Sequence, residues 1–413
     1  MLERALDALL RRLIRRGGLS VTYPDGSTRR YGPGAGPPPP ANGPRSETPV
    51  PGEVAVTIHD KATIRAMLRD PDLGVAEAYM NQRLTIEHDD LRGFLTLAIG
   101  NRADNPPAYA LWRMLPLRRR IRRLLQWNPA PRARHNVAHH YDLSGALYDL
   151  FLDRDRQYSC AYFPTPDLTL DEAQEAKKRH IIKKLALRPG MSVLDIGCGW
   201  GGMALTLARD YGVRVTGITL SEEQLALGRK RVAEAGLEDL ITLELRDYRD
   251  VRGQFDRIVS VGMFEHVGGP HYRRYFRCVR ELLTEDGVAL IHTIGVNGPP
   301  AATSSFIRRY IFPGGALPSL SEIARAVELE KLFFTDIEVL RRHYAETLKK
   351  WEERFTAHAA EAEALYDQRF VRMWRYYLLG SEMTFRLHDL VNFQLQLTRR
   401  NDVLPITRDY MMD

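Results

Sequence analysis

Cysteine is scarce in this chain: only three occur among 413 residues, at Cys160, Cys198 and Cys278. Their spacing matches neither a disulfide framework nor a set of metal ligands. The scarcity excludes a disulfide-stapled secreted scaffold and a cysteine-built metal centre, so no metal site is expected. It also favours a reducing, cytoplasmic compartment.

The sequence also lacks an apolar run long enough to span a bilayer. No signal peptide is expected at its start, because Glu3, Arg4 and Asp7 interrupt the first turns. With 44% hydrophobic and 27% charged residues, the composition is typical of a soluble globular protein. At 413 residues the chain exceeds the length at which one core keeps growing, and two domains are therefore expected.

Positive charge is in excess, with a net charge of +7, and it is unevenly spread. The basic residues cluster in two places, namely Arg11, Arg12, Arg15 and Arg16, and then Arg118, Arg119, Arg120, Arg122 and Arg123. Such clusters suit an anionic partner, either nucleic acid or a phospholipid surface. Solvated helix faces would explain clusters of this size equally well.

Residues 1–125 are predicted to form a small α+β domain. Its expected elements are a basic amphipathic helix at 2–16, a β-hairpin at 19–32, a Pro/Gly-rich loop at 33–52, a strand at 53–60, and helices at 61–69, 74–81 and 90–100. The leucines of the first helix could lie on a membrane interface or pack on their own domain, and the sequence leaves both open.

Residues 126–413 alternate between strand and helix patterns, which predicts a doubly wound α/β sheet. The expected strands are 193–196, 213–220, 241–246, 255–262, 287–294 and 333–340. Long amphipathic helices at 345–363 and 367–390 follow, and then a last strand at 393–400 that we expect to return antiparallel into the sheet.

The most informative stretch of this domain is VLDIGCGWGG, residues 193–202. A buried strand runs into a glycine-rich turn, and a helix follows, as in nucleotide sites of doubly wound sheets. The glycines fit neither the dinucleotide fingerprint nor a phosphate-binding loop. With Asp195 two positions before Gly197, the turn resembles the S-adenosylmethionine (SAM) site of Rossmann-like class I methyltransferases.

Polar residues follow the other predicted strands, where ligands bind in such sheets. Thr219 ends the second strand, in place of a ribose-binding carboxylate, and Ser221 and Gln224 have helix-capping spacing. Asp247 and Tyr248 follow the third strand and suit an adenine edge and face. The glycines have a second explanation too, close packing of helix on strand, which is compatible with binding.

Two further polar residues invite a catalytic interpretation. Glu265 follows the fourth strand, where a buried carboxylate is costly unless it is paired, so a function is favoured. His292 lies within the apolar fifth strand and, on pattern alone, would more often be a satisfied core histidine. Cys160, likewise, would more often be a small buried apolar residue than a ligand.

Taken together, the motifs resemble the cyclopropane-fatty-acyl-phospholipid synthase family, which includes the mycolic acid cyclopropane synthases. They are QYSCAYF (157–163), VLDIGCGWGG (193–202), GITLSEEQ (217–224), VGMFEHVG (261–268), HTIG (292–295) and YIFPGG (310–315). The resemblance covers roughly residues 136–400. The chain departs from the family in its proline-rich loop and at 144–146, where Ser-Gly-Ala replaces a more usual Gly-Asn pair.

The resemblance implies transfer of the SAM methyl group to a cis double bond of an acyl chain, followed by proton loss to a bound bicarbonate. It assigns to the bicarbonate site Cys160, Glu265, His292, the backbone of Ile294, and Tyr344. It assigns to the SAM site Tyr158, Ser159, Asp195, Gly197, Gly199, Thr219, Gln224, Asp247 and Tyr248, with Asp195 expected to brace the turn.

The implied protein is an enzyme that docks peripherally on the inner, anionic membrane surface through its small lipid-binding N-terminal domain and acts on unsaturated phospholipid chains. The resemblance also suggests a homodimer. Three alternatives stay open: a methyltransferase making methylene- or methyl-branched chains, a non-catalytic lipid-binding protein, and a nucleic-acid methyltransferase. The last is disfavoured because no Asn-Pro-Pro-Tyr-type motif follows the fourth strand, and no nucleic-acid partner is expected.

Overall fold

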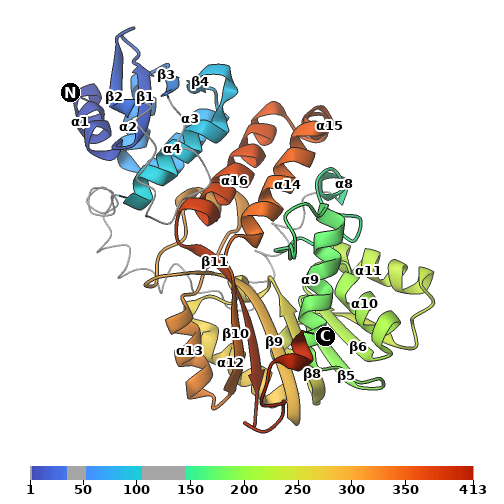
Figure 1. The fold of residues 1–413 in the computed structure, drawn as a ribbon. Helices are drawn as coiled ribbons and strands as arrows, with labels where there is room; N and C mark the ends of the chain where they lie inside the picture. Colours follow the sequence, from blue (N-terminus) through green and yellow to red (C-terminus); the bar gives the residue numbers. More distant parts are fainter. Residues whose placement is uncertain (1, 35–52, 105–144, 413) are drawn as a thin grey trace. The chain divides into compact units, whose positions relative to one another are not determined.

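The computed structural model describes residues 2–34, 53–104 and 145–412 (Figure 1). The chain divides into two compact units. The first comprises residues 1–120, 304–311 and 348–389, and the second comprises residues 121–303, 312–347 and 390–413. The predicted arginine cluster at 118–123 and nearly all of the 33–52 loop lie outside the described residues.

The second unit is built on a seven-stranded sheet with the order β10-β11-β9-β8-β5-β6-β7. Its strands are β5 (Ser192–Ile196), β6 (Arg214–Thr219), β7 (Ile241–Leu245), β8 (Phe255–Val261), β9 (Leu283–Val296), β10 (Phe333–Leu340) and β11 (Leu390–Thr398). The neighbours from β7 to β9 are parallel, whereas β11 runs antiparallel to both β9 and β10. The prediction of a last strand returning antiparallel is therefore confirmed.

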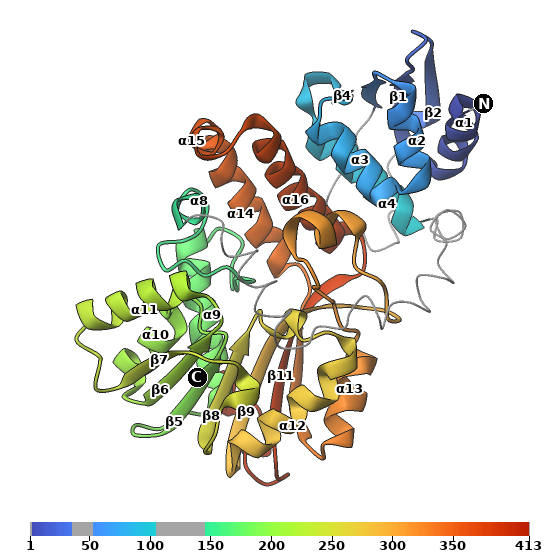
Figure 2. The ribbon, with the colours of Figure 1, turned by 180° about the vertical axis from the view of Figure 1, so that it is seen from behind.

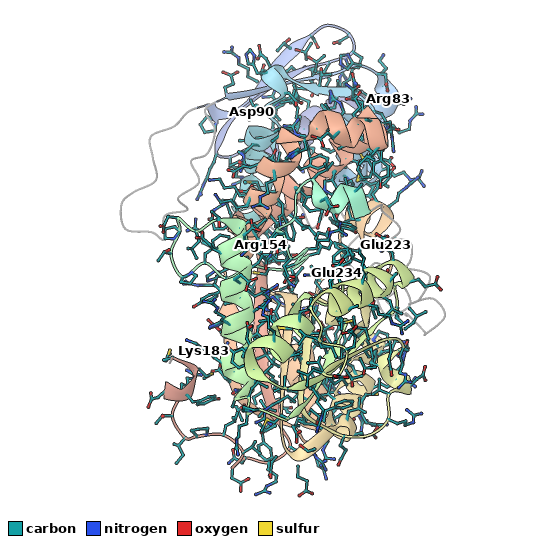
Figure 3. All side chains as sticks on the ribbon, turned by 90° about the vertical axis from the view of Figure 1, so that its right-hand side faces the viewer. Arg83, Asp90, Arg154, Lys183, Glu223 and Glu234 are labelled. Atoms are coloured by element: carbon teal, nitrogen blue, oxygen red, sulfur yellow. The ribbon has the colours of Figure 1, made fainter. Side chains whose placement is uncertain are left out.

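Helices cover both faces of this sheet, as Figure 2 shows from behind. They are α9 (Leu170–Leu185), α10 (Gly202–Tyr211), α11 (Glu222–Glu234), α12 (Tyr272–Leu282) and α13 (Leu320–Leu329), while the short helix α8 (Gly145–Asp149) lies beyond the end of α9. Lys183 marks the end of α9, and Glu223 and Glu234 mark the two ends of α11 in Figure 3.

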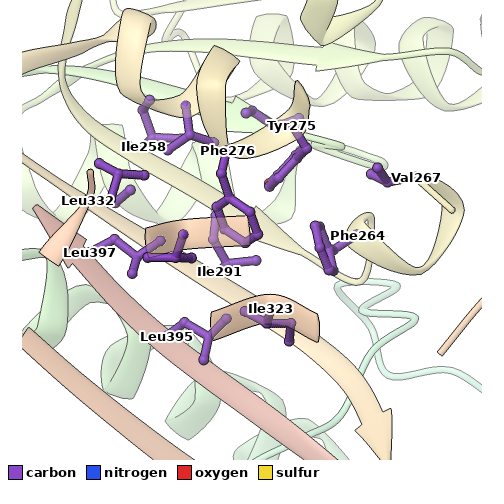
Figure 4. Packing of buried hydrophobic residues seen from close by; sticks show 14 of the residues in the cluster. Ile258, Phe264, Val267, Tyr275, Phe276, Ile291, Ile323, Leu332, Leu395 and Leu397 are labelled. Carbon is purple, nitrogen blue, oxygen red and sulfur yellow. The ribbon is translucent and has the colours of Figure 1, made fainter. Parts of the chain in front are cut away.

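Successive residues of β5 point into different cores, because side chains alternate across a strand. Leu194 and Ile196 belong to the cluster under α12 and α13, which also contains Phe276 and Ile323 (Figure 4). Val193 belongs to the opposite cluster, with residues of α9, α10 and α11. Burial on both faces explains the nearly continuous apolar character of these strands.

The first unit has a four-stranded sheet with the order β2-β1-β3-β4. Its strands are β1 (Gly17–Thr22), β2 (Thr28–Gly34), β3 (Glu53–Ile58) and β4 (Leu84–Ile86), and its N-terminal helices are α1 (Leu2–Leu13), α2 (Lys61–Arg69), α3 (Pro71–Met80) and α4 (Leu91–Asp104). The predicted hairpin is present, and β3 pairs parallel with β1.

The leucines of α1 pack on their own unit. Leu6 is buried, and Leu2, Leu9 and Leu10 contact the same hydrophobic cluster. The leucine face of α1 thus lies against the core of its own unit, which favours the second interpretation of this helix. Contact of the helix with a membrane interface stays a prediction. No helix in the described ranges is long and apolar enough to cross a bilayer.

The units differ from the predicted division at residue 125, because α16 (Gln368–Leu387) belongs to the first unit. Its Leu379 and Met383 lie in that unit's hydrophobic cluster, and its Glu382 accepts a 2.8 Å hydrogen bond from Arg92 of α4. Sequence order alone does not reveal such a contact. The assignment of lipid binding to residues 1–125 and of catalysis to residues 126–413 stays a prediction.

The helix expected at 345–363 is two helices, α14 (His343–Ala357) and α15 (Ala359–Leu365). His358 between them leaves the helical conformation, with φ −111° and ψ 25°. The boundary between the two units falls within α14, after residue 347.

Candidate active site

The glycine turn links the end of β5 to the start of α10. Gly197, Gly199 and Gly201 have φ values of +85°, +55° and +81°, a backbone conformation that residues other than glycine rarely adopt. The Gly197 amide donates to the carbonyl of Ile218 at 2.9 Å, which ties the turn to β6. A Cβ atom on Gly197 would lie only 2.9 Å from Cβ of Met263. The turn therefore needs glycine for both its conformation and its packing.

An open pocket of about 770 Å³, counting its opening to solvent, lies beside this turn. The predicted SAM residues that line it are Gly197, Gly199, Thr219, Gln224, Asp247 and Tyr248. Residues that the sequence reasoning did not assign to the cofactor also line it, among them Arg246, Arg249, Met263 and His266. The carboxyl ends of β5, β6, β7 and β8 thus converge on one cavity, as expected for this sheet type.

Local contacts hold the side of the pocket that is formed by Thr219, Gln224 and Asp247. The Thr219 hydroxyl donates to Oε1 of Gln224 at 2.9 Å, and Ser221 caps α11 by accepting from the Gln224 amide. Asp247 accepts two charge-assisted hydrogen bonds from Arg249, at 2.7 and 2.5 Å. These pairs fix the side chains before any ligand binds.

The other three predicted SAM residues do not line the pocket. Asp195 is buried, its Oδ2 has no hydrogen-bond partner among the described residues, and burial raises its pKa to about 7. Ser159 borders the pocket, because its Cβ would lie 3.9 Å from a Cβ on the lining residue Gly262. Tyr158 packs edge-on against Tyr148, with ring centres 5.5 Å apart.

Glu265 lies in η3 (Phe264–His266), just beyond β8, and its side chain is buried. Its Oε1 accepts a 2.6 Å hydrogen bond from the Ile294 amide, while Oε2 is buried with no partner in the described part of the chain. Burial raises the pKa of Glu265 to about 7. A buried oxygen without a partner costs about 1–3 kcal/mol, which marks a place for a ligand that can hydrogen bond.

His292 is almost completely buried in β9, two residues before Ile294 and therefore on the same face of the strand. Its Nε2 lies 2.7 Å from the side-chain nitrogen of Asn392, and its Nδ1 lies 3.1 Å from that of Gln394. Burial holds the pKa of His292 well below its ordinary value, so the ring is neutral. A neutral ring carries one N–H, so one of the two amides must turn its oxygen toward the ring. Both ring nitrogens then have partners on β11, as in a satisfied core histidine, and the catalytic role of His292 stays a prediction.

Cys160 is fully buried, and burial raises the pKa of its thiol, which keeps it protonated. The next residue, Ala161, donates its amide to Oγ1 of Thr347 at 3.0 Å. This contact sets the Cys160 segment against the start of α14, where Tyr344 is also buried.

The contacts thus divide the predicted bicarbonate residues into two groups, Glu265 with His292 and Ile294, and Cys160 with the helix of Tyr344. One residue, Lys177 of α9, interacts electrostatically with both Cys160 and His292.

Sequence reasoning missed Arg249, Lys177 and the two amides around His292. A signal for the amides was present: Asn392 and Gln394 are polar residues at alternate positions beside a strand predicted to lie inside the sheet. Polar side chains there need partners on the neighbouring strand.

Comparison with known proteins extends these observations. The family model described as "Mycolic acid cyclopropane synthetase" matches residues 129–395. The chain is 39% identical over 335 residues to the cyclopropane-fatty-acyl-phospholipid synthase of Escherichia coli strain K12, covering 81% of this chain and 85% of the relative. It is 44% identical over 287 residues to a probable fatty acid methyltransferase of Pseudomonas putida, covering 67% and 73%.

The fold also matches a solved structure, that of the mycolic acid cyclopropane synthase CmaA1 complexed with SAH and CTAB. The TM-score is 0.62 at 35% sequence identity, over 66% of this chain and 99% of the other. The family model matches well over half of the chain, and the Escherichia coli relative matches 81% of it, so the resemblance seen in the motifs is confirmed. The chain belongs to the mycolic acid cyclopropane synthetase family.

Proposed function

We propose that this chain is a SAM-dependent cyclopropane synthase acting on cis double bonds in the acyl chains of membrane phospholipids. The observation that carries the proposal is an open pocket at the glycine turn, with a buried carboxyl group, Glu265, close in sequence to the lining residues Met263 and His266. The names of the relatives support the substrate class, and the SAH-bound CmaA1 supports the cofactor.

The proposed chemistry requires alignment of the reactants and exclusion of water once they are bound. The double bond attacks the methyl carbon of SAM, so one C–C bond forms, the C–S bond breaks and neutral SAH leaves. The carbocation that results then closes the ring when a proton is lost from the added methyl group. An alkene is a weak nucleophile, so the chain's main contributions are alignment and exclusion of water.

The residues around Glu265 fit a bound bicarbonate, which when present would supply the base for that proton. Glu265 holds a proton at neutral pH in a fraction of molecules, because its pKa is about 7, and its free Oε2 is able to donate to an oxyanion. Neutral His292 adds no competing positive charge. Cys160, Ile294 and Tyr344 complete the proposed set of residues.

Product analysis tests the function. We expect purified protein, incubated with SAM and vesicles of cis-monounsaturated phospholipid, to yield acyl esters with the high-field ring protons of a cyclopropane by NMR. Mass alone does not decide, since a methylene-branched chain is an isomer. Vinylidene protons would instead assign the chain to branching methyltransferases, and a product-free reaction that retains bound cofactor would reject the proposed substrate.

We further propose that the enzyme docks on anionic membrane surfaces through the exposed arginines of α1 and the residues just after it. Arg12, Arg15 and Arg16 are exposed, while the leucine face of the helix is occupied by the core. An electrostatic contact of this kind is worth about 1 kcal/mol per basic residue and is screened by salt.

Vesicle sedimentation checks this docking. We expect binding to vesicles with anionic lipid at low salt, weaker binding at high salt, and weaker binding when Arg12, Arg15 and Arg16 are all changed to Gln. Arg325→Gln, an exposed change on α13, is the control. Equal sedimentation in all conditions would reject the docking surface.

A further inference from the structure

Three polar residues of α9 lie on one buried face of the helix. Gln174, Lys177 and Lys178 are spaced three and four residues apart, which places them side by side. Lys177 is fully buried, a rare situation for a lysine, since burial of an ammonium group is costly unless it is paired. Burial lowers the pKa of Lys177 to about 8. Nothing in the proposed chemistry uses this residue.

All three side chains hold the segment that precedes Cys160. Lys177 Nζ donates to Oε1 of Gln157 at 2.6 Å and to Oγ of Ser159 at 2.8 Å. Gln174 Nε2 donates to the backbone carbonyls of the same two residues, at 3.1 and 2.9 Å.

The segment has a second attachment at its other end. Lys178 donates to Asp155 at 2.8 Å, and Arg231 of α11 pairs with the same carboxylate. Residues 155–159 are therefore fastened at both ends, to α9 and to α11.

The contact between Lys177 and Ser159 determines where the hydroxyl hydrogen of Ser159 points. An ammonium group has only donors, so the Ser159 oxygen must be the acceptor in this hydrogen bond. The hydroxyl hydrogen is then left to point away from Lys177. Ser159 borders the pocket at Gly262, so the hydroxyl hydrogen would be available to an acceptor atom of a cofactor bound there.

Charge supports the same arrangement. Lys177 makes no ion pair within 4.0 Å among the described residues, although the charges of Asp153 and Asp155 act on it. Its own positive charge partly offsets the burial that raises the pKa of Asp195, whose Oδ2 has no hydrogen-bond partner there. In the described part of the chain, one of the three Lys177 N–H donors also has no acceptor. The buried lysine thus couples the 157–159 segment to the acid that precedes the glycine turn.

We propose that Lys177 is a positioning residue for the cofactor, acting through Ser159: it holds the serine oxygen so that the hydroxyl hydrogen is presented to SAM. The inference rests on the proposed SAM site. It adds that affinity for the cofactor depends on a residue of α9 that does not line the pocket.

Calorimetric titration of the full chain with SAH tests the proposal. We expect Lys177→Met and Ser159→Ala each to weaken SAH binding roughly tenfold, the value of one hydrogen bond. The double variant is expected to bind about as weakly as either single variant, because one interaction is lost in all three. Lys183→Met, on the same helix but with its hydrogen bond at the surface, is the matched control and should bind like wild type.

Two results would overturn the proposal. One is additive losses in the double variant, which would mean that Lys177 does not act through Ser159. The other is unchanged affinity in Ser159→Ala, which decides the matter even if Lys177→Met fails to fold. A wild-type chain that bound no SAH would overturn this inference together with the proposed function. One that binds SAH but forms no ring would overturn only the proposed function.

Discussion

Changing Glu265 to Gln is expected to lower turnover about a hundredfold or more while leaving the affinity for SAH unchanged. The carboxamide oxygen is able to accept the Ile294 hydrogen bond that Oε1 accepts now. The amide nitrogen at the other position donates permanently, whereas a carboxyl group with a pKa of about 7 both holds and releases a proton. Glu265 does not line the pocket, so cofactor binding has no reason to change.

Turnover of SAM to SAH on monounsaturated vesicles and calorimetric SAH affinity are the two measurements for this variant. Glu281→Gln, an exposed change on α12, is the matched control and should retain both. Loss of SAH affinity in Glu265→Gln would show that the residue serves the cofactor. Retention of full turnover would remove Glu265 from the chemistry.

Much of the seven-stranded sheet could be predicted from local sequence patterns. The apolar residues Val193 and Leu194 predict a buried strand, and β5 is indeed covered on both faces. The glycines that follow predict a turn, and their positive φ values require glycine there. The positions of Thr219, Asp247 and Glu265 follow from the same rule, since parallel strands end at a common edge. A pattern of period two and a turn signal are enough to gather these residues.

Contacts between segments far apart in the sequence could not be predicted from local patterns. Lys177 stands in a sequence rich in charge, EAQEAKKRH, which would ordinarily indicate a solvated helix face. Only the folded chain shows that the loop with Gln157 and Ser159 covers it. The same holds for the packing of α16 on α4, because the contacting residues Arg92 and Glu382 are nearly three hundred positions apart in the sequence.

Changing Gly197 to Ala is expected to abolish measurable cofactor binding, the largest effect on affinity that we expect from a single methyl group. Two costs add at this position. A positive φ costs an alanine about 1–2 kcal/mol. The new Cβ would also lie 2.9 Å from Cβ of Met263, which lines the pocket, so the turn and the pocket wall must move apart.

Gly190→Ala separates these two costs. Gly190 has a φ of +81°, close to the +85° of Gly197, but no atom lies within 4 Å of the Cβ that alanine would add. Gly190→Ala should therefore lose about 1–2 kcal/mol of stability in thermal or denaturant unfolding, and Gly197→Ala should lose more, because the contact with Met263 adds to the same backbone cost. Only Gly197→Ala should lose SAH binding in calorimetry. Equal SAH affinity in the two variants would show that the glycine turn serves the backbone alone, and the cofactor would then have to bind elsewhere along the sheet edge.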